Sequence, residues 1–134
     1  MNGQDFLRIV HSAFKPSLES LGFSMDPPAI SGRHYRASFT GKSNSVWVSY
    51  EPGDNEFFIF IFTRENGILS DIDDRKKTPR LADLNVSHMP SISGDEHARN
   101  EEFFRGIEAN GKEEKFLLKC AKELRLVLPK HLGS

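Results

Sequence analysis

The sequence has one cysteine, almost no net charge and no long apolar run. The single Cys120 cannot form an internal disulfide or a cysteine metal cluster, and its apolar helical surroundings are typical of a core thiol. Eighteen basic and 19 acidic residues give a net charge of -1. Direct binding of nucleic acid is therefore disfavoured, because no overall positive field would attract a polyanion.

Features of export or membrane insertion are also missing. Met1–Leu7 have acidic and polar side chains where a signal peptide needs a basic and then an apolar stretch. No run approaches the roughly 18 apolar residues of a membrane-spanning helix. We therefore expect a cytoplasmic protein that does not contact a membrane.

Motifs of known catalytic or metal chemistry are absent as well. The sequence has no nucleophile elbow, phosphate loop or dinucleotide fingerprint. The histidines do not have the spacing of zinc ligands; they are His11, His34, His88, His97 and His131. We expect no enzymatic activity, no cofactor and no metal, and a general-base role of His34 or His88 is the weaker alternative.

A short acidic stretch holds Asp71, Asp73 and Asp74, whose oxygen atoms are of the kind that Mg²⁺ or Ca²⁺ prefers. A calcium-binding EF-hand loop starting at Asp71 would need glycine and glutamate where this chain has lysine and alanine. Residues 75–77 are all basic and follow directly. A solvated, self-paired charge run is therefore the favoured interpretation.

Three apolar runs between residues 33 and 63 predict an antiparallel β-meander. The runs are Tyr35–Thr40, Val46–Tyr50 and Phe57–Thr63. The two breaks between them, 41–44 and 52–55, consist of residues that form tight turns. Short turns of this kind join neighbouring antiparallel strands.

One register gives all three strands a common apolar face, with Phe39 opposite Val46 and Tyr50 opposite Phe57. The other face mixes polar and aromatic side chains: His34, Arg36, Ser38, Trp47, Ser49, Phe58, Phe60 and Phe62. Both faces of the third strand are apolar, which predicts cover on both sides. Either the later chain or a partner must supply the second cover.

Helical patterns flank the meander. Apolar residues at three-and-four spacing predict a helix over Gln4–Leu21, ended by Gly22 and kinked or broken at Pro16. Residues 24–32 are expected to have little regular structure. The apolar stripe of the helix Gln4–Leu21 should cover the apolar face of the sheet.

A long charged connection, 64–94, follows the meander. Thr78-Pro79 predicts the start of a short helix that ends near Leu84. Connections of this length inside a small domain are usually functional or partly disordered. We expect this one to act as a lid over Phe58, Phe60 and Phe62.

Two helices are predicted in the C-terminal third, 95–128. Ser93 and Glu96 match a capping box that opens a helix ending near residues 110–111. A second, strongly apolar helix runs from Lys112 to Leu128 and is closed by Pro129. Residues 1–134 thus form one α+β domain: an N-terminal helix, a three- to four-stranded antiparallel meander, a long charged connection and two C-terminal helices packed on the sheet. The predicted core consists of Val48, Phe57, Ile59, Ile61, Leu117 and Leu124.

Two surfaces are candidates for binding a partner. The first is acidic and consists of Asp95, Glu96, Glu101, Glu102 and Glu108, with Asp71, Asp73 and Asp74 as a further contribution. It is either a solvated helix face or a docking surface for a basic protein, and most of its charges are expected to be free for a partner. The second is the mixed sheet face around His34, Arg36, Trp47 and Phe60, which could hold a small ligand or a peptide or simply be polar residues in water.

The layout resembles the small cytoplasmic immunity proteins of bacterial polymorphic toxin and contact-dependent growth inhibition systems. The similarity includes a leading helix that closes in Leu21-Gly22-Phe23, an aromatic meander, a charged connection with Pro79-Arg80-Leu81-Ala82-Asp83-Leu84, and two charged C-terminal helices. The resemblance implies a protein that binds one cognate toxin domain and blocks its active site. A toxin that acts on nucleic acid, such as a basic nuclease, would suit the acidic surface. The sequence leaves the oligomeric state open.

Overall fold

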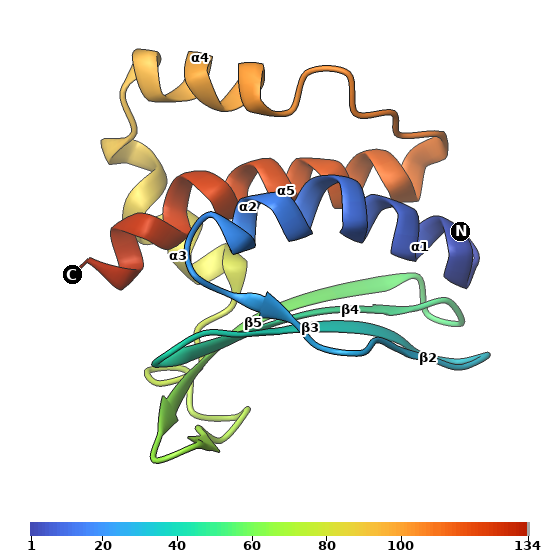
Figure 1. Cartoon of the computed structure of the whole chain (residues 1–134), viewed down its shortest axis with the longest axis horizontal. Helices are drawn as coiled ribbons and strands as arrows, with labels where there is room; N and C mark the ends of the chain where they lie inside the picture. Colours follow the sequence, from blue (N-terminus) through green and yellow to red (C-terminus); the bar gives the residue numbers. More distant parts are fainter. Residues whose placement is uncertain (134) are drawn as a thin grey trace.

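A computed structural model of the chain describes residues 1–133. Its centre is a meander of three long antiparallel strands, β3 (Tyr35–Thr40), β4 (Asn44–Glu51) and β5 (Glu56–Glu65) (Figure 1). In the turn between β4 and β5, Asn55 takes a left-handed conformation with φ of 51°, which asparagine tolerates better than most residues. The structure confirms the α+β class and the order of elements expected from the sequence.

The register of the meander is the predicted one. Phe39 pairs with Val46, and Tyr50 pairs with Phe57. The face that these residues share is buried under helices and includes Tyr35, Ala37, Phe39, Val46, Val48, Tyr50, Ile59 and Ile61. A shift by one residue would have placed Arg36 and Ser38 in that core, so the apolar alternation determined the pairing.

Short strands extend the sheet at both edges. The segment expected to be irregular forms β1 (Ser24–Met25) and β2 (Ala29–Ile30), which both pair with β3. Two prolines at 27 and 28 separate them, because proline has no N–H for a strand ladder. At the other edge, β6 (Ile68–Leu69) pairs with the end of β5. The expectation of little regular structure was therefore wrong for these two short stretches, since the exposed edge of β3 offers backbone partners.

The N-terminal helix is continuous through Pro16 apart from one wider turn. It consists of α1 (Gly3–Ile9), a π-helical turn (Val10–Phe14) and α2 (Lys15–Glu19). Within the π turn the N–H of Lys15 donates to the carbonyl oxygen of Val10, five residues back. A proline ring crowds the preceding turn, and a wider turn placed just before it accommodates the ring without breaking the helix. The predicted disturbance at Pro16 is thus a π turn, and Gly22, with φ of 91°, ends the helix as expected.

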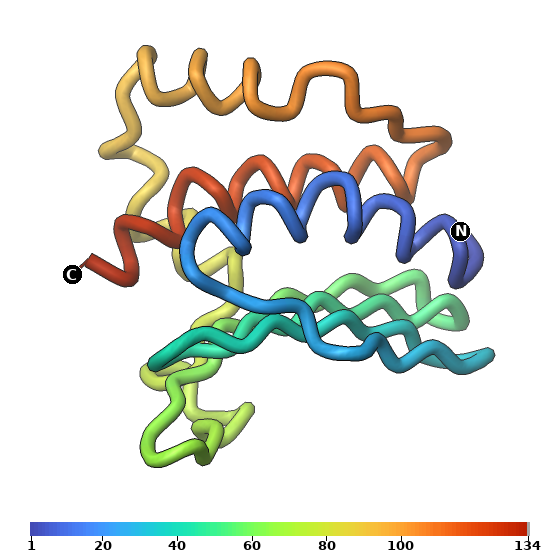
Figure 2. The backbone as a smooth tube through the Cα atoms, in the orientation of Figure 1, coloured from blue at the N-terminus to red at the C-terminus, as the bar shows by residue number. Residues whose placement is uncertain are grey.

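The long helix α5 (Gly111–Leu132) lies beside α1 and α2 on the apolar face of the sheet (Figure 2). Its buried Leu117 and Leu124 belong to one core with Val48, Ile59 and Ile61, and Phe57 packs against that core. This confirms the predicted core. The helix continues past Pro129, where an end was expected. Proline removes only one hydrogen-bond donor from the helix, and buried Val127 and Leu128 hold the last turn in place.

The connection after β5 contains α3 (Leu81–His88) and a 3-10 turn (Met89–Ser91). The helix begins later than predicted because residues 77–80 pair with the outer edge of β5. The N–H of Ile61 donates to the carbonyl oxygen of Pro79 at 2.9 Å, and that of Thr63 donates to Lys77 at 3.1 Å. These residues protect the edge of the sheet instead of forming the first helical turn.

Helix α4 (Gly94–Phe103) lies on the far side of α5 from the sheet (Figures 1 and 2). Its predicted capping box is present: the N–H of Glu96 donates to Ser93 Oγ at 3.1 Å and the N–H of Ser93 donates to the Glu96 carboxylate at 3.3 Å. The helix ends at Phe103, several residues before the predicted end. Gly106 with φ of 85° lies in the irregular stretch that leads to α5. Of the two C-terminal helices, α5 therefore packs on the sheet and α4 packs on α5.

An ion pair between half-exposed Arg8 and buried Glu114 joins the first helix to the last. Arg8 Nη2 donates to the Glu114 carboxylate, and Arg8 Nη1 donates to the carbonyl oxygen of Glu108 at 3.0 Å. The same carboxylate accepts the N–H of Asn110 at 3.1 Å. Glu114 is 6% exposed, so its charge depends on these partners.

Cys120 lies in the core, as the sequence predicted. Burial raises the pKa of its thiol to about 12, with a smaller contribution from nearby Glu123. Because the thiolate is the reactive form, we expect the native protein at pH 8 to react very slowly with a chromogenic disulfide reagent and to react at once in denaturant. Equal rates in the two conditions would show that Cys120 is accessible.

Candidate functional site

The helices cover one face of the sheet and leave the opposite face open (Figure 1). On that open face, Trp47 and Phe58 are half-buried, whereas Phe60 and Phe62 are buried. The predicted lid enters this region through Ile72, which lies beside Phe58 and Phe60. The open face is therefore aromatic and partly accessible, as the period of the strands indicated.

A hollow of about 260 Å³ lies on this face. We call it the aromatic hollow; its lining residues are His34, Arg36, Trp47, Ser49, Glu51, Phe58, Phe60 and Ile72. The structure thus brings together all four residues of the predicted sheet-face site. The alternation of side chains also indicated Phe58 and Ser49, and Ile72 comes from the connection that was expected to cover this face.

Two arginines cover aromatic rings in this region. The guanidinium of Arg36 lies 4.4 Å from the ring centre of Trp47, and that of Arg80 lies 4.7 Å from the ring centre of Phe60. The Phe58 and Phe60 rings are parallel, with their centres 5.9 Å apart. Guanidinium groups bind carboxylates through a planar fork and also stack on rings, so this surface can contact both acidic and aromatic groups of a partner.

Helix α3 fixes the position of Arg80. Arg80 is the N-cap of the helix, its N–H donates to Asp83 Oδ2 at 2.9 Å, and its own Nη1 donates to the carbonyl oxygen of Thr78 at 2.8 Å. The backbone hydrogen bond from Arg80, together with Arg75, lowers the pKa of Asp83. Asp83 therefore stays ionised and keeps this end of α3 in place.

His34 lies at the rim of the hollow. Its Nδ1 is 3.7 Å from a carboxylate oxygen of Glu51. The other proposed general base, His88, lies elsewhere, with its ring 6.2 Å from that of His131. Among residues 1–133, no group of three or more histidine, cysteine, aspartate or glutamate side chains is arranged to hold a metal ion.

The acidic residues of the α4 region are largely used within the chain. Glu96 pairs with Lys130 at 3.4 Å, Glu101 with Lys122 at 3.0 Å, and Glu102 with Arg105 at 2.6 Å. Glu101 and Glu102 are exposed, as expected, but their carboxylates are not free, because each pairs with a basic side chain of the chain itself. Lysines of α5 lie next to α4 and pair with two of the carboxylates, which sequence spacing could not indicate. Asp95 and Glu108 are exposed.

The second acidic cluster is part of its own loop. Asp71 Oδ1 accepts the N–H of Asp73 at 2.8 Å, and Asp74 Oδ1 accepts the N–H groups of residues 76 and 77 at 3.1 and 3.2 Å. The expected charge pairing with residues 75–77 is not found among the described residues, because Asp74 accepts backbone N–H groups and Arg75 pairs with Asp83 at 2.9 Å. This loop lies on the side of the sheet away from α4 (Figure 1). The two acidic clusters therefore do not form one surface.

No helix within residues 1–133 combines the length and apolar character that crossing a membrane requires.

Trp47, with the Arg36 guanidinium over its ring, lines the candidate site. Comparison of the chain with models of protein families, with curated protein sequences and with solved structures found no match.

Proposed function

We propose that the chain is a binding protein of the immunity type, which neutralises a cognate bacterial toxin domain by occluding its active site. The observation that carries the proposal is the open aromatic face of the sheet, with Trp47 and Arg36 at its centre. Both side chains are half-buried, and tryptophan and arginine are among the residues that most often dominate the binding energy of protein interfaces.

The size of the aromatic hollow favours a protein partner over a small ligand. Its volume of about 260 Å³ is below the roughly 300 to 1,000 Å³ of typical small-molecule pockets. A hollow of this size accepts one or two side chains of a partner. A partner that fills the hollow would also cover Phe58, the half-buried phenylalanine of β5 on this face.

The acidic helix α4 is the second candidate surface for the same function. Asp95 and Glu108 are exposed, and so are most other residues of this helix. Three of its carboxylates already pair with basic side chains, so a basic partner would have to replace these ion pairs. Charges at such a rim mainly change the association rate. We therefore place the toxin on the aromatic hollow.

The test is affinity capture from the source organism, followed by a growth assay. The bait proteins are the parent chain, Arg36→Glu, and the control Arg33→Glu, which makes the same charge change at an exposed position that does not line the hollow. We expect the parent and the control to capture one protein that stops growth when expressed alone and is neutralised by co-expression of the chain. Arg36→Glu should weaken its affinity by about 30-fold or more, as expected for a residue worth roughly 2 kcal/mol.

Other outcomes would contradict parts of the proposal. A captured protein that does not affect growth would exclude the immunity function. If Arg36→Glu binds like the parent while the double variant Glu101→Lys/Glu102→Lys loses the partner, the interface is α4. Thermal unfolding of each variant checks that the fold is intact.

A further inference from the structure

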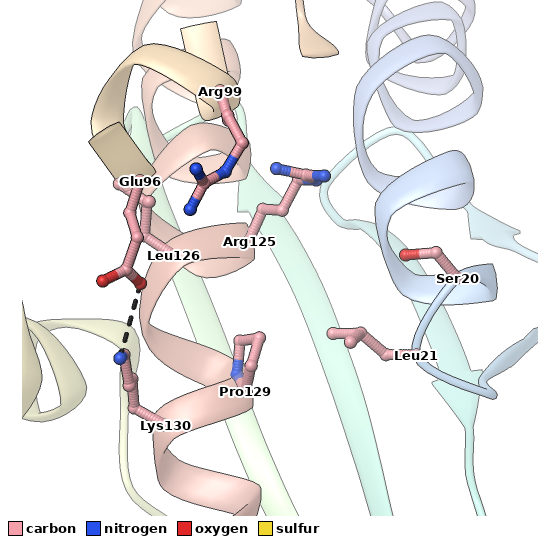
Figure 3. A pocket seen from close by; sticks show the side chains of 8 residues that line it. All are labelled: Ser20, Leu21, Glu96, Arg99, Arg125, Leu126, Pro129 and Lys130. Atoms are coloured by element: carbon pink, nitrogen blue, oxygen red, sulfur yellow. Dashed lines mark ion pairs between the residues drawn. The ribbon is translucent and has the colours of Figure 1, made fainter. Parts of the chain in front are cut away.

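A second hollow lies between the end of α2, α4 and α5 (Figure 3), and no sequence pattern indicated it. Its volume is about 410 Å³. Four ionic side chains line it: Arg99, Arg125, Lys130 and Glu96. Glu96 and Lys130 pair with each other at 3.4 Å, so the two arginines provide the unbalanced charge.

Arg125 is held rigidly by its neighbours. Its Nη1 donates to Asn100 Oδ1 at 2.9 Å, and Asn100, which is 2% exposed, is fixed in turn because its Nδ2 donates to the carbonyl oxygen of Lys122 at 3.0 Å. The guanidinium lies 3.9 Å from the ring centre of Phe103. A guanidinium has five N–H donors, so most of those of Arg125 remain available for a ligand.

Arg99 directly precedes Asn100 on α4, and its guanidinium extends into the same space as that of Arg125 (Figure 3). Within residues 1–133 the Arg99 side chain has no hydrogen bond, ion pair or ring contact. Two guanidinium groups that share a hollow without a carboxylate between them repel each other, and an anion bound between them would turn this repulsion into attraction. Ser20, the residue that follows α2, lines the opposite wall with its hydroxyl (Figure 3).

The rest of the lining suits the organic part of a ligand. Leu21, Leu126 and Pro129 add apolar surface beside the arginines. The volume falls within the range of small-molecule sites, unlike that of the aromatic hollow. Planar guanidinium forks match the oxygen atoms of a phosphate, and two unpaired positive charges match a dianion.

We propose that this hollow binds a small phosphomonoester, with its phosphoryl group between Arg99 and Arg125 and its organic part against Leu126 and Pro129. The proposal is independent of the toxin-binding function. It assigns the α4 side of the molecule to a small ligand and the open sheet face to a protein.

The test is calorimetric titration of the purified chain at low ionic strength, where screening of charges is weakest. The probes are adenosine monophosphate, inorganic phosphate and adenosine, the last being the matched ligand without a phosphoryl group. We expect saturable binding of adenosine monophosphate, weaker saturable binding of inorganic phosphate and no binding of adenosine. Binding of adenosine as tight as that of its monophosphate would overturn the proposal.

Variants locate the site. Arg99→Ala removes an exposed side chain with no hydrogen bond, ion pair or ring contact within the described residues, so it should change thermal unfolding little and weaken phosphate binding by about tenfold or more. Arg125→Lys keeps the charge but loses the fork, and should also weaken binding. The control Arg33→Ala makes the same charge change at a distant exposed position and should stay within about twofold of the parent. Absence of saturable binding for both phosphate probes, or an equal loss in Arg99→Ala and Arg33→Ala, would overturn the proposal.

Discussion

Replacing Leu124 with alanine should lower the free energy of unfolding by about 3 to 5 kcal/mol. Leu124 is 1% exposed and belongs to the core between α5 and the sheet, with Val48, Ile59 and Ile61. Truncation removes apolar contacts and leaves a cavity that close-packed neighbours fill only in part. Since small domains are stable by roughly 5 to 15 kcal/mol, this is a large part of the total.

Urea unfolding of the parent and the variant, followed by fluorescence of Trp47, measures this loss. The matched control is Leu132→Ala in the last turn of the same helix, where the leucine is 38% exposed. The control should cost well under half as much as the core variant. Equal effects of the two substitutions would show that α5 does not present Leu124 to the core.

Replacing Arg8 with alanine should destabilise the fold by about 3 kcal/mol, because it leaves the carboxylate of Glu114 buried without its cation. This value is at the lower end of the stability losses of roughly 3 to 5 kcal/mol that follow when one partner of a buried ion pair is removed. The Arg8 side chain is 41% exposed, and the N–H of Asn110 still donates to the carboxylate in the variant. Removing the charge of Glu114 as well should recover most of the loss.

The double variant Arg8→Met/Glu114→Leu tests this explanation, since apolar residues of similar size often replace a buried ion pair without loss. Its free energy of unfolding should lie within about 1 kcal/mol of the parent value. A double variant as unstable as Arg8→Ala would mean that the packing of Arg8, and not its charge, joins α1 to α5. Urea unfolding at neutral pH provides the comparison.

The proposed division of the surface explains why the acidic side chains of α4 were misleading. Their number suggested a docking surface for a basic partner, yet Glu96 and Glu101 pair with lysines of α5. In the hollow beside α4, by contrast, the guanidinium groups of Arg99 and Arg125 have no carboxylate partner among the described residues. The local charge of a helix is therefore a poor guide to its partner when a neighbouring helix supplies the opposite charge.

The sequence by itself determined the meander and its register. Strand side chains alternate with period 2, so Phe39 and Val46 could share the buried face in one pairing only, and turn residues set the lengths of the breaks. It also determined the start of α4 at Ser93 and the core position of Leu117 and Leu124. All of these depend on interactions within a few residues or on one repeated spacing.

The tertiary structure alone decided the contacts between residues far apart in the chain. Three contacts belong to this group: Arg8 pairs with Glu114, residues 77–80 pair with β5, and Arg99 and Arg125 line one hollow. Each depends on the angle and rotation at which helices and strands pack, which are set by the whole core and not by local preferences. Periodicity therefore located the aromatic hollow, whereas only packing could create the arginine-lined hollow.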